Sequence, residues 1–152
     1  MNKFKRTIIM NTVEKVFSEL KAGTQVSLAS MTASGYPRPV PMSITCIGKN
    51  KEIWFATSLN SEKVKAYREN PKAGVSYYND EFTASMTGKI RIVEDSGKKR
   101  EMWHDTMSLY FPDGAGSKDY CLLQFIPELL RAVTVKDIYK YEVKTILLMN
   151  GK

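Results

Sequence analysis

The apolar residues near the start of the chain recur at the spacing of one helix face. They stand at i, i+3, i+4 and i+7, as Val13, Val16, Phe17 and Leu20. This spacing predicts a helix over residues 10–22 that ends at Gly23. Residues 25–33 then alternate apolar and small polar side chains with a period of two, which predicts a half-buried strand.

Extended segments dominate the rest of the chain. We expect strands at residues 38–48, 53–57, 73–79, 82–95, 120–127, 129–135 and 138–149, with turns or loops at 34–37, 49–52, 79–81 and 111–118. The segment 38–48 contains prolines, which suit the edge of a sheet better than its centre. It should therefore be an edge strand.

Two helices are predicted between these strands. The first covers residues 61–70, with Asn60 or Ser61 as its N-cap and a stop at Asn70-Pro71. The second covers residues 96–111 with Ser96 as its N-cap. Its apolar side chains Met102, Trp103, Met107 and Tyr110 would share one face. Strands joined mostly by hairpin turns, with few helices between them, indicate a mainly β (α+β) fold: an antiparallel barrel of six to seven strands with peripheral helices.

The composition is that of one globular domain spanning residues 1–152. Of these residues, 43% are hydrophobic and 26% are charged. Cys46 and Cys121 lie far apart and outside any CxxC or histidine-rich cluster, so we expect reduced thiols, a cytoplasmic location and no metal site. The apolar stretch at residues 7–10 is too short for a signal peptide, and no segment approaches the ~20 apolar residues of a membrane span.

The net charge of +7 favours anionic partners. Apart from residues 98–100 the basic side chains are scattered, and no RNA-binding or zinc-finger motif accompanies them. We therefore expect a small anionic ligand and no nucleic acid. A basic oligonucleotide-binding barrel stays an alternative, which predicts steeply salt-dependent binding.

Hydroxyl and amide side chains gather with a lysine between a predicted strand and the helix after it. They are Thr57, Ser58, Asn60, Ser61 and Lys63. A helix N-terminus presents unpaired N–H groups and the positive end of the helix dipole, so Ser61 and Lys63 would form a phosphate pocket there. The alternative is that Asn60 or Ser61 only caps the helix and Lys63 is a solvated surface charge.

Arg38 is a second candidate for binding an anion. It begins the predicted edge strand between prolines that offer no backbone donors, and its guanidinium can hold anionic oxygens with two hydrogen bonds. By itself it would be read as a surface charge. Because Arg38 and the turn at residues 57–63 lie one hairpin apart, they can converge on one ligand.

Three segments in this order resemble a known family. They are ASMTASGYPRPVPMS, IWFATSLNSEKVKAYRENPKAGVSYY and TASMTGKIRIVED. The chain resembles the pyridoxamine 5′-phosphate oxidase-like flavoproteins with a split β-barrel fold, and within them the small general stress protein branch. The later WHDTMSLYFPDG and LLQFIPELLRAV resemble the same branch, so the resemblance covers roughly residues 10–135.

The resemblance implies FMN bound at a homodimer interface. Arg38 would contact the FMN phosphate, which Ser61 and Lys63 would also hold. The segment through Val40, Met42 and Ser43 would run beside the isoalloxazine ring, and Thr57 and Ser58 would approach the ring or the ribityl chain.

Two further positions are carried over from the resemblance. Thr83 matches a position from which relatives reach the flavin with a polar side chain. Trp103, with Phe111, would cover the flavin from the partner subunit, although aromatic residues at helical spacing also commonly fill a core.

The chain also departs from the authentic oxidases. Glu62 stands where they have an arginine before the turn lysine, which would weaken phosphate attraction unless Glu62 points away. Ser43 replaces their substrate lysine, and their Arg-x-His substrate element has no counterpart. Oxidation of vitamin B6 is therefore not expected. The single histidine, His104, could donate a proton to the flavin or substrate, or be purely structural.

The leading interpretation is an FMN-dependent oxidoreductase that acts on an unidentified small substrate, with NAD(P)H as a possible electron donor. No side chain stands out as a catalytic acid or base, so no catalytic residue is assigned. The alternative is a non-enzymatic protein of the same fold that binds, stores or senses flavin, haem or a deazaflavin. Haem would need an axial ligand, for which His104 is the one histidine.

Overall fold

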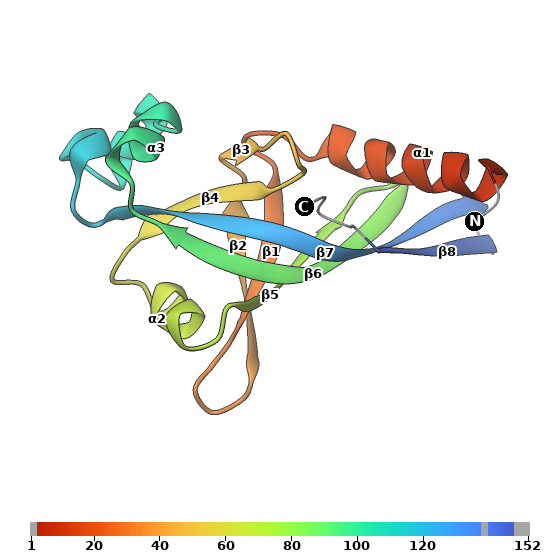
Figure 1. Cartoon of the computed structure of the whole chain (residues 1–152), viewed down its shortest axis with the longest axis horizontal. Helices are drawn as coiled ribbons and strands as arrows, with labels where there is room; N and C mark the ends of the chain where they lie inside the picture. Colours follow the sequence, from red (N-terminus) through yellow and green to blue (C-terminus); the bar gives the residue numbers. More distant parts are fainter. Residues whose placement is uncertain (1–2, 138–139, 148–152) are drawn as a thin grey trace.

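The fold is one curved antiparallel sheet with helices at its periphery (Figure 1). It is seen in a computed structural model that describes residues 3–137 and 140–147. The strands are β1 (Gln25–Met31), β2 (Pro37–Ser43), β3 (Cys46–Ile47), β4 (Ile53–Ser58), β5 (Lys72–Tyr78), β6 (Phe82–Val93), β7 (Tyr120–Asp137) and β8 (Lys140–Leu147). The α-helices are α1 (Lys3–Glu19), α2 (Glu62–Glu69) and α3 (Ser96–Glu101), and two 3-10 helices follow, η1 (Asp105–Leu109) and η2 (Gly114–Gly116).

The strand order curls the sheet into a split barrel. The order is β2-β1-β5-β6-β7-β4-β3, with β8 beside β7. β2 and β3 stand at opposite ends of this order, yet only Ile44 and Thr45 separate them along the chain. The Gly23 N–H donates to the Ile44 carbonyl at 2.8 Å, and the Thr45 N–H donates to the Trp54 carbonyl at 2.7 Å. The predicted fold class is confirmed, and β2 is an edge strand as the prolines predicted.

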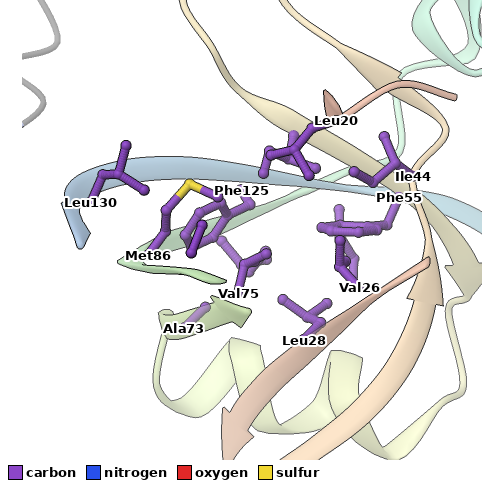
Figure 2. Close-up of a cluster of buried hydrophobic side chains, with 14 of the residues drawn as sticks. Leu20, Val26, Leu28, Ile44, Phe55, Ala73, Val75, Met86, Phe125 and Leu130 are labelled. Carbon is purple, nitrogen blue, oxygen red and sulfur yellow. The ribbon is translucent and has the colours of Figure 1, made fainter. Parts of the chain in front are cut away.

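Alternate residues of each strand point into one core. In β6 every second residue from Phe82 to Ile90 is buried, and the residues between them are exposed. Figure 2 shows part of this core, in which side chains from several strands meet Leu20 from the end of the first helix segment. The face of the sheet turned toward this core is called the inner face below, and the opposite face is called the outer face.

A second, smaller cluster covers part of the outer face. Its buried members are Trp54, Met102, Phe111, Tyr120 and Leu122. Trp54 and its neighbour Phe55 are both buried because they point to opposite faces of β4. The chain from α3 through η2 therefore acts as a lid on this end of β4 and β7.

The helix predicted over residues 96–111 is wrong in its extent and its N-cap. α3 ends at Glu101, and Asp95 caps it by accepting a hydrogen bond from the Lys98 N–H at 2.8 Å. The chain becomes extended at His104 (φ −124°, ψ 142°) before η1 begins. Packing on the outer cluster decides this path. Tyr110, which was predicted on the buried face, is 79% exposed.

Residues 120–135 form one strand instead of the two that were predicted. Pairing of β7 with β6 shifts register between Thr87 and Gly88, and Glu128 has no partner in that ladder. This bulge accommodates Pro127, which cannot donate a ladder hydrogen bond. A Cβ on Gly88 would lie 2.1 Å from the Ile126 carbonyl oxygen, so the bulge requires glycine at this position.

Other boundaries differ less. α1 begins at Lys3, before the start predicted at residue 10. The prediction missed these first turns because they carry no regular apolar spacing. The predicted strand 38–48 divides into β2 and β3 at the bend that closes the barrel. β8 confirms the strand predicted over 138–149 in part, and positions 138–139 and 148–149 lie outside the described residues. None of the described helices is both long and apolar enough to span a membrane.

Candidate functional site

The turn between β4 and α2, residues 59–61, is held by hydrogen bonds to the start of β7. The Ser58 hydroxyl donates to Asp119 Oδ1 at 2.7 Å, and Asn60 Nδ2 donates to the same oxygen at 3.0 Å. The Leu59 N–H donates to the Asp119 carbonyl at 2.6 Å. The Asn60 N–H donates to the Ser58 hydroxyl at 3.2 Å. Asp119 therefore fixes the shape of this turn, which we call the elbow.

Ser61 is the N-cap of α2, one of the two residues predicted for this position. Its backbone is extended (φ −68°, ψ 150°), but its side chain makes no capping hydrogen bond. The Ser61 Oγ is buried and has no hydrogen-bond partner among the described residues. Buried hydroxyls are nearly always paired, because an unpaired one loses its hydrogen bonds to water without replacement. The elbow thus holds an unsatisfied polar atom.

The first turn of α2 also has unpaired backbone donors. In the described part of the chain, the Glu62 and Lys63 N–H groups have no acceptor, whereas those of Val64 and Lys65 donate to the Ser61 carbonyl. Open N–H groups at the positive end of a helix dipole attract an anion. The open N–H groups and the Ser61 hydroxyl therefore lie together at the N-terminal end of α2.

Lys63 reaches from α2 to the end of β4. Its Nζ donates to Thr57 Oγ1 at 3.0 Å, and Thr57 is buried on the inner face of β4. Burial lowers the pKa of Lys63 below its usual value, and the positive charge of Arg38 lowers it further. Arg38 is thus close enough to Lys63 for the two cations to repel each other.

Glu62 is paired with Lys65 within α2, and it also lies near Arg38. Its carboxylate accepts a hydrogen bond from Lys65 Nζ at 2.8 Å, and this bond lowers the pKa of Glu62. Among the described residues no carboxylate forms an ion pair with Arg38 or Lys63. Glu62 interacts with Arg38 only beyond ion-pair distance, so neither Arg38 nor Lys63 is directly neutralised by a described carboxylate.

A cavity of about 520 Å³ opens between α2 and the end of the β1–β2 hairpin. It is lined by Ser30, Met31, Thr32, Ala33, Arg38, Glu62, Lys65, Ala66, Glu69 and Asn70. Arg38 lies opposite Ser30 in the β1–β2 ladder, at the open end of the inner face. The volume is within the range of small-molecule sites.

The structure places the three residues predicted beside a flavin ring on both faces of β2. Val40 and Met42 follow Arg38 on the inner face, where both are half-buried. Ser43 points to the other face, and its hydroxyl accepts a hydrogen bond from Gln25 Nε2. Only Val40 and Met42 therefore share the side of β2 that leads to Arg38.

Thr83 and Trp103 lie away from the elbow within one chain. Thr83 is exposed on the outer face of β6 and pairs with Tyr78, at the opposite end of the β5–β6 hairpin from Pro71. Trp103 is half-buried in the outer cluster, with its ring edge-on to Tyr120 at 5.5 Å between centroids. His104 next to it is exposed. Ser58 also points to the outer face, away from its neighbour Thr57.

Sequence reasoning missed Asp119. This residue lies 59 positions beyond Asn60, in a loop that was assigned only turn character. Its role depends on the pairing of Ser58 with Tyr120, and a register between distant strands is not readable from one sequence. A lone aspartate before a strand carries no signal of its own.

The arrangement fits a phosphate monoester. A dianionic phosphate offers acceptors for the Ser61 hydroxyl and the open N–H groups of α2, and it would balance the charges of Arg38 and Lys63. Glu62 and Glu69 also line the cavity beside Arg38, but Glu62 is held by Lys65, and among the described residues neither carboxylate pairs with Arg38 or Lys63. The residues present therefore fit the phosphate end of FMN.

Comparison with known proteins identifies the family. The family model described as pyridoxamine 5′-phosphate oxidase like matches residues 11–131. No curated protein sequence matches the chain.

Solved structures share the fold at low sequence identity. A protein related to general stress protein 26 of B. subtilis (pyridoxinephosphate oxidase family), from Clostridium acetobutylicum, matches with a TM-score of 0.71 at 22% identity, over 92% of this chain and 95% of that one. A pyridoxamine 5′-phosphate oxidase-related, FMN-binding protein from Nostoc punctiforme matches with a TM-score of 0.67 at 15% identity, over 96% and 97%. A heme-binding protein from Mycobacterium smegmatis matches with a TM-score of 0.59 at 15% identity, over 81% and 53%.

These structural matches agree with the fold described above. The family match spans the elbow, the β1–β2 hairpin and most of β7, and so includes every residue of the candidate site. The chain belongs to the pyridoxamine 5′-phosphate oxidase-like family.

Proposed function

We propose that this protein binds FMN and acts as a flavin-dependent oxidoreductase on a small substrate, as a homodimer. One observation carries the proposal: the buried, unpaired Ser61 hydroxyl lies at the N-terminus of α2, next to Lys63, and neither Lys63 nor its neighbour Arg38 forms an ion pair with a described carboxylate. A folded protein keeps such a cluster at a cost in stability, and a bound phosphate removes that cost.

The residues divide the work of holding the cofactor. Ser61, Lys63 and the first N–H groups of α2 bind the phosphate from the elbow, and Arg38 binds it from the hairpin. The inner face of β2 then offers Val40 and Met42 as an apolar strip for the ring. Thr57 helps to hold Lys63 in place, because its hydroxyl accepts a hydrogen bond from the Lys63 Nζ.

The homodimer is proposed because two predicted contacts lie far from the elbow in one chain. Thr83 is on the outer face of the β5–β6 hairpin, and Trp103 is in the outer cluster. If either residue contacts flavin, it contacts the flavin held by a second copy. Both positions would then belong to the neighbouring site, as the family resemblance implies.

FMN held by these residues would supply hydride-transfer chemistry, with NAD(P)H as a possible electron donor. The protein's own groups bind, orient and exclude water. The buried titratable groups offer no general base: burial raises the pKa of Cys121 to about 11 and that of Tyr120 to about 12. Both groups are therefore protonated at neutral pH, and no catalytic acid or base is assigned.

The alternative of a flavin or haem carrier makes a different prediction. Haem would need an axial ligand in an apolar pocket, and His104 is exposed on the lid. FMN suits the site better, because its dianionic phosphate can both balance the two cations and accept from the open N–H groups of α2. A carrier that stores flavin stays distinct from the proposed enzyme in one respect: bound flavin would not be reduced by a physiological donor.

Absorbance spectroscopy tests both parts of the proposal. The purified protein is titrated with FMN, and the complex is then mixed anaerobically with NADH or NADPH and a panel of electron acceptors. We expect a shifted flavin spectrum on binding and bleaching of the visible flavin absorbance band by one donor. An unshifted spectrum contradicts FMN binding, and a shifted band that no donor bleaches contradicts the enzymatic role.

A further inference from the structure

A second cavity, of about 600 Å³, lies on the outer face beside the candidate flavin site. It is lined by Ala29, Ser30, Met31, Pro37, Asn70, Lys72, Ala73, Gly74, Thr87, Gly88, Lys89 and Glu128. Ser30, Met31 and Asn70 also line the cavity next to Arg38. The two cavities therefore meet at the end of β1, one on each side of the strand.

The floor of this outer cavity is flat because three small or short residues lie side by side across three strands. Ala29 pairs with Gly74, and Gly74 pairs with Thr87. Larger side chains form the next row of the sheet on one side of this floor, where Met31 pairs with Pro37 and Lys72 pairs with Lys89. Such a surface accommodates a planar apolar body.

Nothing in the fold requires glycine at position 74. It lies within β5 where pairing with β6 shows no register shift, and a Cβ there would make only ordinary contacts, at 3.7 and 3.9 Å. Glycine inside a strand costs stability, and it often marks close approach of a ligand. Gly88 differs, because an added Cβ would collide with the Ile126 carbonyl oxygen. The chain itself therefore gives no reason for glycine at position 74, and its lack of a side chain leaves the floor of the cavity open.

Two positive charges stand directly opposite each other at the margin of the cavity. Lys72 and Lys89 are paired residues of β5 and β6, and both are exposed on the outer face. Like charges at such paired positions destabilise a sheet. Glu128 lies 3.6 Å from the Lys89 Nζ, and in the described part of the chain Lys72 has no carboxylate partner. One cation of the pair is therefore uncompensated.

From these features we infer that the outer cavity binds a small planar molecule with one anionic group, of the aromatic or conjugated carboxylate class. The carboxylate is held by Lys72 and Lys89, and the ring lies on the floor over Gly74. That this molecule is the substrate of the flavin enzyme rests on the proposed function. Binding of the molecule itself does not.

The test uses two probes of equal shape and different charge. Binding of 2-naphthoate and of neutral 2-naphthamide to the full-length protein is measured by calorimetry and by amide NMR shifts, with and without saturating FMN. We expect 2-naphthoate to bind at least tenfold more tightly, with shifts centred on Gly74 and Thr87. Equal binding of the two probes, or shifts elsewhere, overturns the inference.

Three variants locate the interaction. Lys72→Gln should weaken 2-naphthoate about tenfold and leave 2-naphthamide unchanged, while Lys118→Gln, at an exposed lysine outside the cavity, should change neither. Gly74→Val should weaken both probes without lowering the melting temperature, which a purely structural glycine would not allow. Unchanged 2-naphthoate binding in a Lys72→Gln Lys89→Gln double variant overturns the assignment. So does a Gly74→Val variant that binds both probes as the parent does and differs only in its oligomeric mass.

The two proposals fail in different measurements. If FMN does not bind but 2-naphthoate binding depends on Lys72, the proposed function fails and the outer cavity stands. If FMN binds and the protein binds the charged and the neutral probe equally, the outer-cavity inference fails and the proposed function stands.

Discussion

At the scale of single residues, the proposed anion site contains groups that lower the stability of the unliganded protein. The Ser61 hydroxyl is buried without a partner, and Lys63 is held partly buried near a second cation. Each of these features is unfavourable in the unliganded protein. Removing either side chain should therefore preserve the fold and weaken the ligand, which is the opposite of what a structural residue would show.

Ser61→Ala tests the orphan hydroxyl. Because Ser61 makes no capping hydrogen bond, alanine removes no stabilising contact, and it relieves the unpaired buried oxygen. We expect the flavin-free variant to be as stable as the parent or up to about 1 kcal/mol more stable, with FMN affinity reduced by about 1 kcal/mol. Urea denaturation and FMN fluorescence quenching measure the two quantities. A clear loss of stability would show that the hydroxyl has a partner in solution.

Lys63→Met tests the buried cation and its pH dependence. The variant should lose about 1.5–3 kcal/mol of FMN binding, the scale of a charged hydrogen bond, and bind riboflavin as before. In the free protein the pKa of Lys63 is lowered from its usual 10.5, and a bound phosphate raises it. At a pH between the Lys63 pKa of the free protein and that of the FMN complex, FMN binding by the parent therefore takes up a proton. The affinity for FMN should fall as pH rises from the first pKa to the second.

The lowered pKa of Lys63 also makes the stability of the flavin-free protein depend on pH. A lowered lysine pKa means that charged Lys63 costs stability below its folded pKa, and that this cost disappears as pH rises toward 10.5. Stability of Lys63→Met should exceed that of the parent at pH 7, with the gap closing toward pH 10.5. Lys49→Met, at an exposed turn lysine, is the control and should show neither effect. A pH-independent FMN affinity in the parent would contradict this account.

At the scale of elements, the phosphate elbow depends on a contact between β4 and β7. The sequence alone predicted β4, α2, an N-cap at Asn60 or Ser61 and the proximity of Arg38 to the turn that holds Lys63, since these follow from local spacing and turn chemistry. It did not predict Asp119, which lies 59 positions beyond Asn60, because strand register over that distance leaves no local pattern. The helix predicted at 96–111 failed for a related reason. Its aromatic spacing suits a helix, but packing on Tyr120 selects a short helix and a 3-10 turn.

Asp119 is expected to act on FMN only through the elbow. Asp119→Ala removes the acceptor for both Ser58 and Asn60 and should weaken FMN about tenfold. Asp119→Asn keeps a side-chain oxygen in place and should retain most of the affinity. The ratio of FMN to riboflavin dissociation constants is the readout, because a general loss of folding would weaken both ligands. Equal losses in the two variants would point to the charge of Asp119 instead of its geometry.

The β6–β7 bulge makes a stability prediction that is independent of any ligand. In Gly88→Ala the new Cβ would lie 2.1 Å from a backbone oxygen, which cannot move without breaking the ladder. We expect a loss of about 3 kcal/mol, at the upper end of overpacking costs. Gly74→Ala is the matched control in the neighbouring strand, where the Cβ has room. A Gly88→Ala variant with unchanged urea midpoint would show that the bulge relaxes.

At the scale of the whole molecule, the fold class follows from the hairpin-rich pattern, and the barrel closes because β2 and β3 are joined by a two-residue bend. The relative placement of Thr83, Trp103 and the elbow does not follow from any local pattern. One chain leaves these positions apart, which is why the proposed flavin site includes a second copy. The central claim, however, lies in a single chain: Arg38, Ser61 and Lys63 hold one phosphate.

The most direct measurement of that claim compares FMN with riboflavin, which differ only in the phosphate. Both dissociation constants are determined by fluorescence titration of the flavin-free protein at pH 7.5. Two or more charge-assisted hydrogen bonds should make FMN bind about 100-fold or more tightly than riboflavin. Equal dissociation constants would contradict the account, because the elbow would then have no part in flavin binding.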